Sequence, residues 1–171
     1  QFDRKVPGGP LAPLPAPSID TGMGLERLAA IVQGTNSNYE TDLFLPLIAC
    51  AGDLLEAAAG ERVAYRMGEG GESDVAYRVI ADHARAAAFL VADGVYPDNE
   101  GRGYITRLLV RRAVRFGRKL GFVDPFFHSV CDRVVDEMAA AYPELAERRD
   151  VIARVVSREE EVFIQTFDEG A

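Results

Sequence analysis

The sequence lacks the features that would assign it to several common classes of protein. No apolar run in its 171 residues approaches the length of a membrane span, and no basic and apolar leader is present. The two histidines, His83 and His128, do not have the spacing of metal ligands, and His83 is expected to pack against a neighbouring helix. Cys50 and Cys131 lie far apart within helical patterns. We therefore expect buried thiols in a reducing compartment, the cytoplasm, and no metal site.

Two common nucleotide-binding motifs are also missing. A P-loop would need Gly-Lys-Ser or Gly-Lys-Thr, which occurs nowhere in the chain. A dinucleotide-binding fingerprint would need a third glycine at position 27, where Arg27 stands instead. The net charge of −8 argues against a protein that binds polyanions over its whole surface. With 48% apolar residues, the chain can bury one core.

What the sequence does contain is a helical pattern from residue 24 onward, after a short β segment. Residues 1–21 are expected to form β structure, with a turn at Pro7–Pro10, and the chain therefore begins within a strand pattern, as a fragment would. The fold class predicted is mainly α. The expected helices are Leu25–Gln33, Asp42–Ala59, Asp74–Ala92, Gly103–Leu120, Asp124–Ala141 and Pro143–Asp168. Left-handed helix caps are predicted at Gly34, Gly60, Gly94 and Gly121, and an N-cap at Asp124.

The junction between the β segment and the first helix has the pattern of a ligand site. Asp20, Gly22 and Gly24 alternate onto one face of a strand, and two of them have no side chain, so a flat ligand could lie against the backbone. Arg27 follows in the first helical turn, where backbone N–H groups favour an anion. The alternative interpretation is a tight turn followed by a solvated arginine. The residues expected to be buried on the opposite face are Ile19, Met23 and Leu25.

One predicted helix has a strongly basic side. Six basic residues of Gly103–Leu120 fall within roughly 140° of a helical wheel at about 100° per residue, and Arg102 precedes them. Arginine donates planar, bidentate hydrogen bonds that suit phosphates, so this side is predicted to bind a polyanion. The alternative is pairing with nearby carboxylates such as Asp132, Asp136 and Glu137. The six basic residues are Arg107, Arg111, Arg112, Arg115, Arg118 and Lys119. The side expected to be buried carries Ile105, Leu109, Ala113, Phe116 and Leu120.

The loop before this helix carries one side chain that could read a nucleobase. Asn99 lies close to the helix N-terminus, and its amide both donates and accepts hydrogen bonds. Such a group could contact a base edge while the arginines hold the phosphates. Taken alone, Asn99 fits a turn or capping residue better than a base contact.

Taken together, these motifs resemble those of the alanyl-tRNA synthetases, a family of class II aminoacyl-tRNA synthetases. In class II enzymes the third signature motif alternates small and apolar residues and ends in Glu-Arg before an apolar helix. This chain departs from that pattern by having Asp20 at a position that is usually small. The resemblance runs from about residue 1 to the end. The segments that carry it are Asp20–Arg27, Asn36–Tyr39, Asp42–Phe44, Ile80–Arg85, Ala92–Gly94, Asn99–Tyr104 and Arg111–Arg115.

The resemblance implies roles for individual residues. Asp20, with Gly22, would hold the α-ammonium group of alanine, and Arg27 would bind the triphosphate of ATP above Gly22 and Gly24. Asn99 would approach the guanine–uracil wobble pair of the tRNA acceptor stem, opposite an aspartate expected beyond the end of this chain. Residues 1–35 would be the end of the catalytic domain, and residues 36–171 most of the tRNA-recognition domain.

The resemblance also implies an activity for a longer parent protein. That protein would form alanyl-adenylate from alanine and ATP with magnesium, then transfer the alanyl group to its tRNA. The other two class II motifs are expected upstream of Gln1, and a zinc-carrying editing domain downstream, so we expect the fragment alone to be inactive. No DNA or membrane partner is expected. Two alternatives are a non-enzymatic helical RNA-binding or adaptor module and a helical scaffold with charged faces.

Overall fold

The structure, a computed structural model, describes residues 2–16, 21–68 and 70–169 and confirms the mainly α fold class. At the N-terminus, β1 (Phe2–Asp3) pairs antiparallel with β2 (Ala12–Pro13), so the β segment is shorter than predicted. The helices that follow are α1 (Leu25–Gln33), the 3₁₀ turn η1 (Asn38–Glu40), α2 (Leu45–Ala59), α3 (Glu72–Ala92), α4 (Gly101–Leu120), α5 (Phe127–Met138), α6 (Pro143–Glu147) and α7 (Arg149–Glu169). Within these ranges, no helix is long and apolar enough to cross a bilayer.

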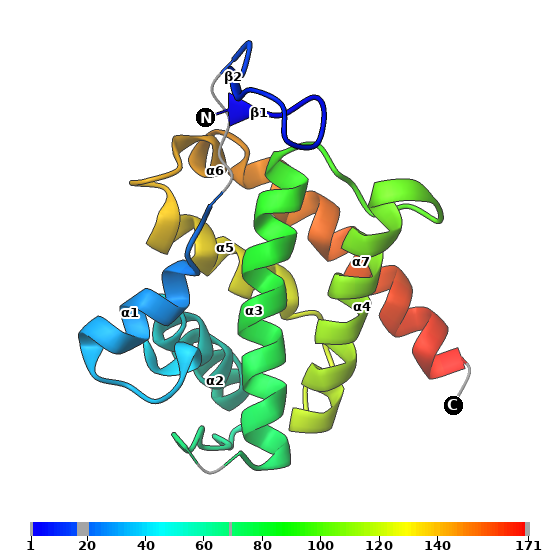
Figure 1. The fold of residues 1–171 in the computed structure, drawn as a ribbon. Helices are drawn as coiled ribbons and strands as arrows, with labels where there is room; N and C mark the ends of the chain where they lie inside the picture. The colour runs from blue at the N-terminus through cyan, green and yellow to red at the C-terminus, as the bar shows by residue number, and fades with distance from the viewer. Residues whose placement is uncertain (1, 17–20, 69, 170–171) are drawn as a thin grey trace.

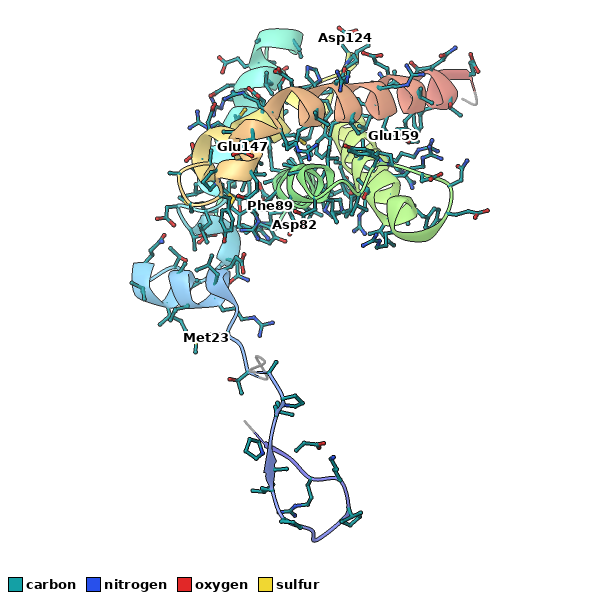
Figure 2. All side chains as sticks on the ribbon, turned by 90° about the horizontal axis from the view of Figure 1, so that it is seen from above. Met23, Asp82, Phe89, Asp124, Glu147 and Glu159 are labelled. Carbon is teal, nitrogen blue, oxygen red and sulfur yellow. The ribbon has the colours of Figure 1, made fainter. Side chains whose placement is uncertain are left out.

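The central element of the fold is α3. It runs through the middle of the bundle in Figure 1 and is seen end-on in Figure 2, with α4, α5 and α7 around it. Small side chains form much of its buried surface, so neighbouring helices can approach closely. The buried alanines of α3 are Ala76, Ala81, Ala84, Ala87 and Ala88. The long-range core therefore sits on an alanine-rich helix, with larger side chains supplied by α2, α5 and α7.

Most predicted helix ends agree with the structure. Gly34, Gly60 and Gly121 cap their helices in the left-handed conformation, with φ of 68°, 71° and 114°. The predicted N-cap at Asp124 is wrong, because α5 begins at Phe127. The predicted helix Pro143–Asp168 is divided at Arg148 into α6 and α7.

The N-terminus of α5 is capped from a distant part of the chain. Glu160 of α7 is 0% exposed, and its carboxylate accepts hydrogen bonds from the backbone N–H groups of Phe126 and Phe127, both at 2.8 Å, and of His128 at 3.3 Å. A negative charge is favourable where helix N–H groups lack partners. This buried carboxylate explains why α5 starts at Phe127 without a local side-chain cap.

The imidazole of His128 lies beside the same carboxylate, with Nδ1 3.3 Å from Glu160 Oε2. This hydrogen bond raises the pKa of His128 above its ordinary 6.5. Because the pKa of His128 is higher in the folded state, its protonated form stabilises the fold. This stabilisation is fully present below pH 6.5 and is lost as the pH rises through the folded-state pKa. We expect the melting temperature difference between wild type and His128→Gln to be larger at pH 5.5 than at pH 8.5. Equal differences at the two pH values would contradict the pairing.

The apolar side of α1 is exposed, which corrects the sequence prediction. Met23, Leu25 and Leu28 are exposed, and Val32 is 77% exposed, whereas Ala30 is the buried residue of this helix. The boundaries of α1 agree with prediction, but no described element covers the side that carries these residues. Residues 21–24 form no strand, and the predicted strand around Ile19 lies outside the described residues.

Candidate nucleic-acid interface

Helix α4 buries a side rotated from the one predicted, although Ala113 and Leu120 are buried as expected. Its buried side is made largely of small residues, which lets the helix lie close against the alanine-rich α3. Ile105, expected to be buried, is 53% exposed, and Leu109 and Phe116 are partly exposed. The buried residues are Gly103, Thr106, Val110, Ala113, Val114, Gly117 and Leu120. Close packing of small residues therefore decided which side faces the core, and the larger apolar residues flank the basic side.

Three of the predicted basic residues are paired with carboxylates of α7. Arg111 Nε donates to Glu159 Oε1 at 2.7 Å, and Arg107 Nε lies 3.3 Å from the same oxygen. Arg118 donates to both oxygens of Asp168 at 2.8 Å. For these three arginines, the alternative interpretation of pairing with carboxylates is therefore the correct one. The carboxylates named for it were wrong, because Asp132, Asp136 and Glu137 pair with Arg149 and Arg133.

Four other basic residues remain open to solvent. These are Arg102, Arg112, Arg115 and Lys119, which we call the exposed cation set. Within the described residues, none of the four has a salt-bridge partner. Arg112 and Lys119 flank the ring of Phe116, with their charged groups 5.8 and 5.3 Å from the ring centre. The surface here is positive even though the chain as a whole is acidic.

A shallow hollow of about 790 Å³ lies along this exposed side of α4. Its lining combines apolar residues, including Leu108, with four cations, and α3 and α7 contribute one aromatic side chain each, His83 and Phe163. His83 Nδ1 lies 2.9 Å from Asp82 Oδ2, and this hydrogen bond lowers the pKa of Asp82. The other ring nitrogen, Nε2, is buried without a partner among the described residues. His83 therefore packs within the bundle as predicted, but only one of its two ring nitrogens has a hydrogen-bond partner among the described residues.

The loop before α4 is held in place by small and polar residues of the helix. A Cβ on Gly103 would lie 2.3 Å from the carbonyl oxygen of Tyr96, so only glycine fits there. Asp98 N donates to the carbonyl of Gly103 at 3.1 Å, and the buried hydroxyl of Thr106 donates to the carbonyl of Val95 at 3.0 Å. These contacts fix the path of the loop that carries Asn99.

Asn99 is exposed at the tip of this loop and does not cap α4 with its side chain. Its Oδ1 accepts a hydrogen bond from Arg107 Nη1, and its backbone N–H donates to Asp98 Oδ1 at 2.6 Å. The structure thus brings Asn99, Arg107 and Glu159 into one connected group. Sequence reasoning missed Glu159. The signal was a carboxylate at helical spacing from Ile152 and Val156, on a side that is otherwise apolar.

The second predicted site, at the start of α1, is only partly described. Asp20 lies outside the described residues. Gly24 is the extended residue just before the helix, and Arg27 is exposed and folds back toward it, since a Cβ on Gly24 would lie 3.5 Å from Arg27 Cδ. Gly22 has open space around it. Gly24 and Arg27 are therefore in contact, and both glycines and the arginine are accessible.

An ion pair fixes α1 to the bundle. Arg85 of α3 donates to Glu26 at 2.5 Å, and the Arg85 guanidinium lies 4.3 Å from the ring centre of Phe44. A hydrogen bond from its own backbone N–H, together with Arg85, lowers the pKa of Glu26. Arg27, the next residue, is thereby held on the outer side of α1 while Glu26 faces the bundle. Among the described residues, no group of three or more His, Cys, Asp or Glu residues could hold a metal ion.

Comparison with known proteins decides the family. The sequence model of the tRNA synthetases class II (A) matches residues 1–171, which is the whole chain. The chain belongs to this class II (A) tRNA synthetase family. It is 52% identical over 170 residues to a protein named alanine–tRNA ligase from Anaeromyxobacter dehalogenans (strain 2CP-C), covering 99% of this chain and 18% of that protein. It is 51% identical over 171 residues to alanine–tRNA ligase from Myxococcus xanthus (strain DK1622), with the same coverage.

Membership of the family confirms the resemblance drawn from the motifs. The chain spans about 18% of the length of the curated relatives it matches, so it corresponds to one part of those class II synthetases.

Proposed function

We propose that this chain is the part of an ATP-dependent alanine–tRNA ligase that contains the end of the amino-acid activation site and a surface for the tRNA acceptor stem. The parent protein would activate alanine with ATP and transfer it to tRNA in the cytoplasm. Identity of about half the residues to proteins named alanine–tRNA ligase, over nearly the whole chain, is the observation that carries this proposal.

At the start of α1, the residues fit the binding of alanine and ATP. Gly22 and Gly24 leave backbone accessible to a flat ligand, and the side chain of Arg27 lies against Gly24, from where its guanidinium could reach an anion. Asp20 would supply a carboxylate for the ammonium group of alanine. When bound, magnesium would neutralise charge on the transferring phosphates, while Arg27 would hold the triphosphate oxygens in position. Adenylate formation would then depend chiefly on the placement of charge around the reacting groups.

On α4, the exposed cation set fits the RNA backbone. Arg112, Arg115 and Lys119 line the hollow on α4, and Arg102 is exposed at the N-terminal end of the same helix. Among the described residues, none of the four has a salt-bridge partner. We assign the phosphate contacts mainly to these four. Arg107, Arg111 and Arg118 are paired with α7, so they would contribute charge to the surface but fewer direct contacts. Asn99 would contact a base edge at the end of this surface.

Binding of an RNA hairpin that reproduces an alanine acceptor stem tests the RNA part of the proposal. We expect the 171-residue chain to bind this hairpin with an affinity that falls as the salt concentration rises, because phosphate contacts release counterions. The measurement is a titration at two ionic strengths. Absence of binding at both would contradict the assignment of an RNA surface to α4.

Arg27→Ala, made in a full-length ligase that contains this sequence, tests the activation site. We expect ATP–pyrophosphate exchange with alanine to slow by about a hundredfold, because a cation that stabilises the transferring phosphates is lost. Arg154→Ala serves as the control, since Arg154 is exposed on α7. Exchange at the wild-type rate in the Arg27 variant would remove this arginine from the ATP site.

A further inference from the structure

We propose that Arg107 and Glu159 are positioning residues that hold the amide of Asn99 with its NH₂ group directed outward. This inference rests on the proposed function, because it specifies how the Asn99 end of the RNA surface would recognise a base pair. It changes the role expected for Arg107, from a phosphate contact to a residue that acts through Asn99.

The contact between Arg107 and Asn99 determines which end of the amide is free. A guanidinium has five N–H donors and no acceptor, so the amide atom that faces it must be the oxygen. Arg107 Nη1 donates to Asn99 Oδ1, which leaves the NH₂ group on the solvent side. Within the described residues, no hydrogen-bond partner occupies that NH₂ group. Asn99 therefore presents an oriented donor.

Glu159 keeps Arg107 in the position from which it can do this. Its side chain is 8% exposed, and its Oε1 accepts a hydrogen bond from Arg111 Nε at 2.7 Å. The same oxygen forms an ion pair with Arg107 Nε at 3.3 Å, without the geometry of a hydrogen bond. Arg107 is also largely buried, with 21% of its side chain exposed. A free arginine side chain samples many rotamers, whereas one held between a buried carboxylate and a loop does not. Asn99 is exposed, so its orientation depends on this anchored neighbour.

An oriented donor restricts what Asn99 can recognise. The minor groove of an A-form RNA stem is wide and shallow and displays base edges to protein side chains. Pyrimidine O2 and purine N3 atoms are acceptors there, whereas the guanine amino group is a donor. The Asn99 NH₂ group therefore matches an acceptor. A wobble pair shifts its two bases relative to each other, so the acceptors lie in different places from those of a guanine–cytosine pair.

Paired variants of α7 test this inference. Two RNA hairpins that differ only in a guanine–uracil or guanine–cytosine pair are titrated with the 171-residue chain, and the ratio of their dissociation constants is measured. The discrimination ratio is the dissociation constant of the guanine–cytosine hairpin divided by that of the guanine–uracil hairpin. Glu159→Gln should reduce this ratio by about fivefold, the size expected for one misplaced hydrogen bond. Asp168→Asn is the matched control, because it also removes an α7 carboxylate that pairs with an arginine of α4. It should leave the ratio unchanged.

Two further variants separate positioning from effects on folding or on charge. Arg107→Lys keeps the positive charge but not the planar fork, so it should shrink the ratio without changing the salt dependence of binding. Asn99→Asp keeps an oxygen for Arg107 and replaces the NH₂ group, on an exposed residue, and should shrink the ratio equally. If Glu159→Gln and Arg107→Lys both retain the wild-type ratio, the positioning role is refuted while the RNA surface stands. If the wild-type chain binds neither hairpin, the proposed function itself fails.

Discussion

Reversing two charges of the exposed cation set, in the double variant Arg112→Glu and Arg115→Glu, should weaken binding of the acceptor-stem hairpin by about a hundredfold at moderate salt. Both arginines are exposed and have no salt-bridge partner among the described residues, so their charge is available to RNA phosphates. Each lost phosphate contact should also reduce the slope of log affinity against log salt by about 1. Titrations over a series of salt concentrations measure both quantities.

The matched control changes the net charge equally at another surface. Arg154 and Arg158 lie on the exposed side of α7, opposite its buried residues Ile152 and Val156 at about 100° per residue. The double variant Arg154→Glu and Arg158→Glu should therefore leave the salt slope close to that of wild type. If both double variants weaken binding equally, only the net charge matters, and α4 is not the RNA surface.

Glu160→Gln should give the largest loss of stability among single conservative substitutions, about 2–3 kcal/mol. The carboxylate is fully buried and accepts hydrogen bonds from three consecutive backbone N–H groups at the start of α5. A glutamine removes the negative charge and one acceptor from this buried position. At about 2–4 °C per kcal/mol for a domain of this size, the melting temperature should fall by about 5–10 °C.

The neighbouring glutamate is the control for that substitution. Glu161 is exposed, and among the described residues its carboxylate accepts a hydrogen bond only from Ser157, at 3.0 Å. Glu161→Gln should therefore change the free energy of unfolding by less than about 0.5 kcal/mol. Similar losses in the two variants would show that the α5 cap does not depend on the Glu160 carboxylate.

Local sequence signals predicted the helices well, and they were weakest where a partner lies far along the chain. The limits of α1 and the left-handed caps at Gly34, Gly60 and Gly121 follow from apolar spacing and from glycine's access to positive φ. The start of α5 did not follow, because its cap comes from Glu160, more than thirty residues away. Proline after Asp124 gave a local capping signal that this long-range carboxylate overrides.

For the candidate site too, local motifs predicted some features, whereas others depend on contacts between distant helices. The motifs identified the family from residue types and order. Asn99 and Arg27 are exposed, as are Arg112, Arg115 and Lys119 of the predicted basic side, whereas its other three arginines are partly buried. The sequence could not separate the arginines that pair with α7 from those that remain open. Glu159 and Asp168 lie about fifty residues from their partners, and only helix packing brings them together.

By itself, therefore, the sequence determined the helical periodicity, the left-handed turns and the family, because each depends on residue types at short spacing. The tertiary structure decided which side of α4 is buried, since Gly103 lies against the loop at Tyr96 and Gly117 lies against the ring of Phe126. It also decided the partners of the arginines and the cap of α5. Those depend on side chains that meet only when α7 packs across the bundle.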